Sequence, residues 1–231
     1  MTESSRTLII ACAVMKDELL AVNHAPNIQI EFLEQALHRT PAKMPGAIQE
    51  KIHQADGYDY IVLGYGSCGN GIAGVRAEKR PLVIPKAHDC ITLLFGSLQA
   101  HLKEHEKVPG TYYLTKGWIE EAKDPLGVLE EYTQRYGRKT AEWVLEQEFK
   151  NYKRIVLVTN GTFDPAKYRS RARANAEFLG LAYEEIPGSL AFFEKLVQGR
   201  WDNSEFVILK PGEEVTQQVF LSLIGCPSSP A

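Results

Sequence analysis

Short apolar runs recur along this chain, and segments with a helical period separate them. The runs have strand length, favour β-branched and aromatic residues, and mostly end in glycine, proline, asparagine or a polar residue. They lie at residues 8–12, 28–32, 60–63, 82–84, 112–114, 155–158 and 206–209. Because they are continuously apolar rather than alternating, they are typical of parallel strands that are buried on both faces.

Helical patterns fill the intervals between these runs. They predict helices over residues 42–55, 91–106, 118–123, 126–152, 168–179 and 189–198, with a break in the fourth near Gly137. Over residues 91–106 the apolar positions fall on one face of a helix. Strands that alternate with helices imply βαβ units. The predicted fold class is therefore α/β, with mostly parallel sheets and helices on both faces.

The length of 231 residues suits a single α/β unit or two Rossmann-like lobes. A seam between lobes is expected near residues 75–86, with the C-terminal helix returning to the first lobe.

Composition narrows the class of partner. The formal net charge of -3 provides no basic footprint, so nucleic acid is not expected as a partner. No apolar run approaches the roughly 18 residues of a membrane span, so no membrane association is expected. The polar start leads straight into a strand and is not a signal peptide, which favours a cytoplasmic location. A small-molecule substrate is the expected partner.

Three of the four cysteines follow strand-like runs. Cys12 ends the first run, Cys68 lies in the glycine-rich stretch 64–71, and Cys90 follows the run at 82–84. Open α/β sheets place their sites at the carboxyl ends of strands. Cysteines in a reducing compartment are thiols or ligands more often than disulfides. The pattern therefore predicts a metal or reactive-thiol site.

Thiolates are good ligands for zinc and iron. Cys12, Cys68 and Cys90, with His38 as a further ligand, would form a zinc site, and an iron–sulfur cluster is the alternative cofactor. Tetrahedral zinc takes about four ligands in a structural site, or three and an open position in a catalytic one. The competing interpretation is that a cysteine such as Cys12 is simply a small buried hydrophobe.

His88 and Asp89 directly precede Cys90. His88 is a candidate ligand or general base, and Asp89 is a candidate catalytic partner in a Cys-His-Asp arrangement that needs no metal. Asp89 could instead cap the helix that begins near Ile91. A thiol at that helix start would be favoured as thiolate by the helix dipole.

Other residues are candidates for holding a cofactor. Gly66, Gly69 and Gly71 allow positive φ angles and close approach of the backbone to a ligand. Gly64 to Gly69 also has the spacing G-x-G-x-x-G, but no acidic residue ends the next strand, which disfavours a nicotinamide or flavin site. Trp118 and Asn160 follow predicted strands. Asn160 is predicted to face a pocket, and Trp118 either lines a pocket or packs against the following helix.

The chain resembles the family catalogued as domain of unknown function 1638. The resemblance covers nearly the whole chain and is specific in the cysteine motifs. The matching pieces are Ile9–Ala13, Lys16–Leu19, Leu37–His38, Gly64–Gly71, His88–Ile91, Leu93–Gly96, Tyr113–Trp118, Pro187–Ser189, Gly199–Asp202 and Pro211–Gly212. Lys116 departs from the family's Thr-Pro-Gly-Trp pattern, so that turn is expected to be looser here.

The resemblance implies a link to one-carbon metabolism, because genes of such families often stand beside those of corrinoid-dependent methyltransferases. One hypothesis is a zinc-dependent enzyme that transfers a methyl group to or from a thiol, with a corrinoid protein as partner. A second is an accessory protein that holds a corrinoid or another tetrapyrrole-like ligand and catalyses nothing. A third is a metal-free enzyme with a cysteine nucleophile.

Overall fold

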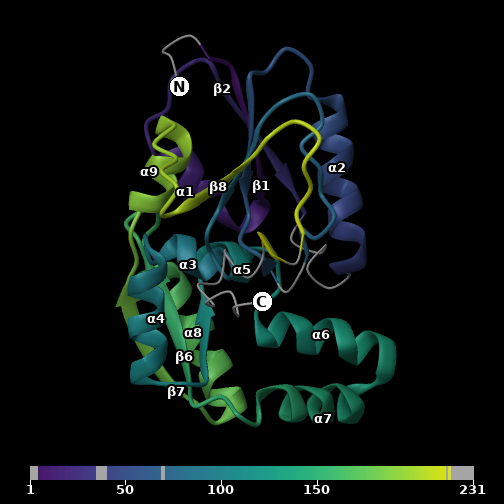
Figure 1. The fold of residues 1–231 in the computed structure, drawn as a ribbon. Helices are drawn as coiled ribbons and strands as arrows, with labels where there is room; N and C mark the ends of the chain where they lie inside the picture. Colours follow the sequence, from purple (N-terminus) through teal and green to yellow (C-terminus); the bar gives the residue numbers. More distant parts are fainter. Residues whose placement is uncertain (1–4, 35–40, 69–70, 217, 220–231) are drawn as a thin grey trace, which may run out of the picture. The chain divides into compact units, whose positions relative to one another are not determined.

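The structure is a computed structural model that describes residues 5–34, 41–68, 71–216 and 218–219. The chain forms two compact units, each containing one of the two sheets (Figure 1). Unit 1 consists of residues 1–100 and 189–231, and unit 2 of residues 101–188. Residues 75–86, where the sequence suggested a seam, lie inside unit 1, and the chain returns to unit 1 at Ser189.

Unit 1 is built on a five-stranded sheet with the order β2-β1-β3-β4-β8. Its strands are β1 (Thr7–Cys12), β2 (Ile28–Leu33), β3 (Tyr60–Gly64), β4 (Leu82–Pro85) and β8 (Phe206–Leu209). The first four are parallel, and β8 pairs antiparallel with β4. Every residue of β1 is buried, so the middle of the sheet forms the core of this unit.

Helices lie on both sides of this sheet. They are η1 (Ala13–Met15), α1 (Lys16–Ala21), η3 (Pro41–Lys43), α2 (Met44–Gln54), α3 (Cys90–Leu94) and α9 (Ala191–Gln198). Figure 1 shows α2 on one side of the sheet and α1 with α9 on the other. Helix α4 (Leu98–Lys107) crosses the boundary between the units.

Unit 2 is built on a three-stranded parallel sheet with the order β5-β6-β7. The strands are β5 (Thr111–Leu114), β6 (Arg154–Thr159) and β7 (Ala182–Pro187). The helices are α5 (Lys116–Glu120), α6 (Pro125–Tyr136), α7 (Arg138–Phe149) and α8 (Ala166–Leu179). Leu114, Ile155 and Leu157 form the core with Ala172 and Ala176 of α8.

These elements confirm the predicted α/β class, and every apolar run is a strand. Strand β7 was missed, because this edge strand is largely exposed and has no apolar run. The break at Gly137 is confirmed, and this residue has a φ of 80°. The single helix expected over 91–106 is wrong, because Gly96 with a φ of 79° separates α3 from α4. Among the described residues, no helix has the length and apolar character needed to cross a membrane.

Candidate thiol site

The order of strands in unit 1 reverses beside β1. Strand β2 pairs on one side of β1, and the chain then crosses to place β3 on the other side. Ligands of open α/β sheets bind outside the carboxyl ends of strands at such a reversal. Cys12 is the last residue of β1, and Cys68 lies in the loop after β3. Two of the predicted thiols therefore flank the position that this topology favours for a site.

The three thiols lie within electrostatic range of one another. Cys12 and Cys90 are buried, and Cys68 is half-buried. Burial, then Asp89, then Cys12 raise the pKa of Cys68, although backbone hydrogen bonds oppose them. Burial, Asp89, Cys68 and Cys12 raise the pKa of Cys90 well above its ordinary value. Cys68 and Cys90 therefore favour the protonated form, and Cys12 lies near enough to contribute to both shifts.

Backbone hydrogen bonds join the loop after β3 to the loop after β4. The Ser67 amide donates to the Ala87 carbonyl at 2.8 Å, and the Cys68 amide donates to the His88 carbonyl at 2.9 Å. The Ser67 hydroxyl also donates to the His88 carbonyl, at 2.8 Å. These bonds hold Cys68 beside the chain that leads to Cys90.

The glycines of the first loop are explained by contacts within the protein. A Cβ on Gly66 would lie 2.6 Å from the backbone nitrogen and Cα of Asp89. A Cβ on Gly71 would lie 2.7 Å from the Met44 sulfur. Close packing of protein atoms therefore accounts for both glycines, and binding of a cofactor there stays a prediction. Gly69 lies outside the described residues.

Cys68 has the unusual backbone conformation that the sequence suggested for the glycines. Its φ is 47°, in the left-handed region that residues with a side chain rarely adopt. The Gly71 amide donates to the Cys68 carbonyl at 3.2 Å and closes the turn. A left-handed non-glycine residue costs on the order of 1–3 kcal/mol, and such residues cluster at functional sites. Ala122, with a φ of 50°, shares this feature, so the turn supports a role for Cys68 only together with the neighbouring thiols.

Asp89 caps helix α3, as one of the two interpretations of the sequence predicted. Its carboxylate accepts from the Ile91 amide at 3.0 Å and from the Thr92 amide at 3.2 Å. The carboxylate thus has a structural role at the start of the helix that carries Cys90. Its catalytic role stays a prediction, as does that of His88, whose side chain is half-buried.

Tyr65 is a residue of this site that the sequence analysis did not single out. It directly follows β3, and only 1% of its surface is exposed. Burial is the first cause that raises its pKa, and Cys12, Cys68 and Cys90 are the next three. A phenol held neutral beside thiols can donate a hydrogen bond to a thiolate. The sequence feature that could have identified Tyr65 is its position between a buried strand and the glycine-rich turn.

Sulfur donors at this site fit a soft metal chemically. Within the described ranges, no group of three or more His, Cys, Asp and Glu side chains has an arrangement ready to hold a metal ion. His38 lies outside those ranges, so its role as a ligand stays a prediction. Binding through the three thiols would therefore require the sulfurs to move closer together.

Trp118 and Asn160 belong to unit 2, whereas the thiols belong to unit 1. Trp118 packs against the buried cluster that contains Leu114. The Asn160 side-chain oxygen accepts from the amide and the hydroxyl of Thr162, at 3.3 and 2.8 Å. Both residues thus have local contacts, and their predicted role in holding a cofactor is untested.

The comparisons with known proteins agree with the resemblance stated from the motifs. A family model described as a protein of unknown function, DUF1638, matches residues 32–197. That range contains Cys68 and Cys90 and begins after Cys12. Neither the curated proteins nor the solved structures provide a match to this chain.

Proposed function

Because this chain belongs to the DUF1638 family, whose description assigns no activity, we propose its function from the thiol site. The protein binds zinc through Cys12, Cys68 and Cys90 and transfers a methyl group to or from a substrate thiol. The observation that carries the metal site is that these thiols follow three neighbouring strands and act on one another electrostatically.

The electrostatics around the thiols support a cation as the ligand of this site. Burial is the main cause that raises the pKa of Cys68 and Cys90; Asp89 and Cys12 raise both further, and Cys68 adds to the effect on Cys90. A cysteine nucleophile without a metal usually has a lowered pKa, so the metal-free alternative is less well supported. Three protein ligands leave a fourth position of tetrahedral zinc open. An iron–sulfur cluster commonly takes four cysteines, which makes zinc the better match to three.

Bound zinc would lower the pKa of a substrate thiol at that open position. The half-buried His88, two residues before Cys90, is the group that would accept the thiol proton. The substrate sulfur then forms a bond to the methyl carbon as the bond between that carbon and the donor breaks. The donor leaves with the electron pair, so the charges balance. A methylated corrinoid is the donor class to which the family resemblance points.

Metal analysis of anaerobically purified protein tests the site. We expect one zinc per chain, and we expect each of the variants Cys12→Ala, Cys68→Ala and Cys90→Ala to bind zinc at least about a hundredfold more weakly. Cys226→Ala is the matched control, because it removes the fourth cysteine and should leave the metal in place. Stoichiometric metal in the triple variant would refute the ligand set. Iron with labile sulfide would assign a cluster instead.

The reaction is tested separately with methylcobalamin and a small thiol. We expect a thioether product, detected by mass spectrometry, together with demethylated cobalamin, detected by absorbance. The Cys68→Ala variant should lose the product, and Cys226→Ala should keep it. Tight binding of cobalamin with no thioether would favour the accessory role, and the zinc assignment would stand.

A further inference from the structure

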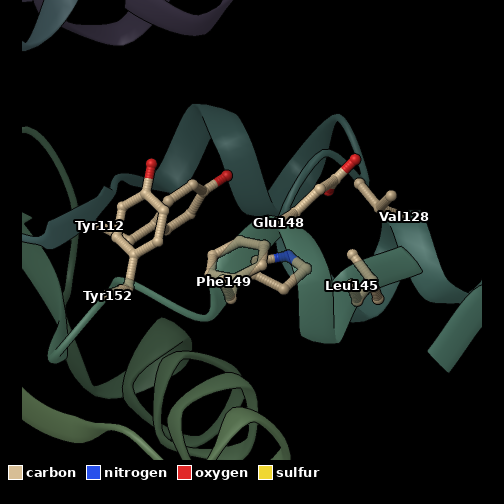
Figure 2. Close-up of a pocket in the computed structure, with 7 residues that line it drawn as sticks. Tyr112, Val128, Leu145, Glu148, Phe149 and Tyr152 are labelled. Atoms are coloured by element: carbon tan, nitrogen blue, oxygen red, sulfur yellow. The ribbon is translucent and has the colours of Figure 1, made fainter. Parts of the chain in front are cut away.

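A cavity of about 320 Å³ lies wholly within unit 2. It is formed between β5, the hairpin of α6 and α7, and the turn before β6 (Figure 2). Its volume is near the lower end for small-molecule sites, roughly 300 Å³. Nothing in the proposed thiol chemistry uses this cavity, so any ligand there would be a second activity of the chain.

One part of the lining is a cluster of three aromatic rings. Tyr112 and Phe149 have ring centroids 5.0 Å apart at an interplanar angle of 62°, and Tyr112 and Tyr152 are 5.7 Å apart at 77°. Phe149 and Tyr152 are 5.0 Å apart at 41°. Figure 2 shows these rings together at the cavity. All three rings line the cavity, so part of the surface of each ring can contact a ligand.

The rest of the lining is aliphatic apart from one charge. Pro125, Val128 and Leu145 contribute apolar surface, and Glu148 contributes a carboxylate. No lysine, arginine or histidine is among the described residues that line this cavity. The neighbouring cavity shares Phe149 and Tyr152 with it, contains Lys150 beside its glutamates and lacks Tyr112. The cavity in Figure 2 therefore combines ring faces, apolar surface and negative charge.

We propose that this cavity binds a small organic cation that carries apolar substituents, of the methylated ammonium class. Such a cation is attracted to aromatic ring faces by their quadrupoles and keeps apolar groups for contact with aliphatic side chains. Glu148 adds charge attraction from α7. An anion would meet the carboxylate and the ring faces, both of which repel it.

Calorimetric titration of the full-length protein with choline tests the proposal. The matched probe is the neutral analogue of choline in which carbon replaces nitrogen, because it keeps the shape and loses the charge. We expect choline to bind saturably and about tenfold more tightly than the neutral analogue. Equal affinity for the two probes would refute recognition of a cation, and absence of binding would show that the cavity is only a packing gap.

Variants then assign the binding to this cavity. Tyr112→Leu keeps apolar volume and loses a ring that the neighbouring cavity lacks, so the preference for choline should fall about tenfold, while Tyr112→Phe should keep it. Glu148→Gln should weaken choline about threefold and leave the neutral analogue unchanged. Glu146→Gln is the control on the same helix, because Glu146 lines the neighbouring cavity instead. Unchanged selectivity in a folded Tyr112→Leu variant would place the binding elsewhere and overturn the proposal.

Discussion

The two units differ in how their buried polar groups are surrounded. In unit 2, Arg154 is 4% exposed and donates to the Glu104 carboxylate at 2.7 Å. The fully buried Asp124 accepts from Arg171 at 2.7 Å and from Asn175 at 2.6 Å. These charges have partners of opposite sign or matching hydrogen-bond donors within the unit. Such networks stabilise the fold and need no ligand.

In unit 1 the buried thiols have neighbours that carry the same sign of charge. Burial is the largest cause that raises the pKa of Cys68 and Cys90, and Asp89 and Cys12 oppose ionisation of both. Since buried charge is normally paired, a thiolate cluster of this kind would be completed by a cation from outside the chain. The comparison separates buried charges that the fold itself balances, as in unit 2, from the thiols of unit 1, for which a cation is proposed.

The largest effect is expected from breaking the ion pair in unit 2. Arg154→Met leaves Glu104 buried without its guanidinium partner, so the free energy of unfolding should fall by about 4 kcal/mol in chemical denaturation. Arg138→Met removes an exposed pair with Glu142, 2.6 Å apart, and should cost less than about 1 kcal/mol. Similar losses in both variants would contradict the contrast between buried and exposed pairs.

Acid should reduce the difference in the free energy of unfolding between the wild type and Arg154→Met. Burial tends to raise the pKa of Glu104, but hydrogen bonds from Lys107 and Arg154 outweigh it, and the pKa is lowered. A lowered folded-state pKa contributes stability above the ordinary carboxyl pKa, and this stability is lost as the pH falls through the lowered value. The gap between the wild type and Arg154→Met should therefore narrow on acidification. A constant gap would argue against the ion pair.

Acid should also weaken metal binding in unit 1. The cause here is that the pKa of the thiols is raised, whereas the pKa of Glu104 is lowered. The raised pKa of Cys68 and Cys90 means that zinc must displace thiol protons. One displaced proton already makes the affinity fall about a hundredfold between roughly pH 8 and pH 6, and a second steepens the fall. A competition titration with a zinc chelator measures this slope. A flat profile would mean that thiols are not the ligands.

A smaller effect on stability and zinc affinity is expected at the contact between the loop after β3 and the loop after β4. Gly66→Ala forces a Cβ against the Asp89 backbone and should reduce the free energy of unfolding by about 2 kcal/mol. Zinc affinity should fall as well, because Cys68 would lose its place beside His88. Gly46→Ala is the matched control, since its Cβ would meet nothing within 4 Å. Unchanged zinc affinity in Gly66→Ala would show that the contact between the loops does not determine zinc binding.

The smallest effect concerns thiol reactivity without metal. Because the pKa of Cys68 is raised, its thiolate fraction at neutral pH is below that of a free cysteine. Alkylation by iodoacetamide, followed by peptide mass spectrometry, should be at least about tenfold slower than for free cysteine. Rapid modification at neutral pH would instead favour the metal-free nucleophile.

Much of the fold was predictable because buried strands have a local signature. Strands β1 and β6 are apolar along nearly their whole length, and each was located from composition alone. Strand β7 was not, because an edge strand with residues such as Glu184 and Glu185 has no apolar run. Helix α3 was extended too far, since the apolar period continues past Gly96 although its positive φ ends the helix.

The candidate site was predictable only in part. Cys12, Cys68 and Cys90 stood out because each follows a strand, and strand ends are where α/β sheets bind ligands. Asp89 was correctly offered as a cap, because aspartate before a helix start is a local signal. Tyr65 was missed, since a tyrosine beside a strand looks like ordinary core until its neighbours are known.

The sequence by itself determined most of the strands and helices and which three thiols lie near strand ends, because these depend on the residues that follow one another in the chain. Only the tertiary structure decided that β1 lies between β2 and β3, that Cys68 takes a left-handed turn, and that burial and Asp89 raise the pKa of Cys68. Strand order and burial arise from contacts between distant segments, and no local pattern encodes them.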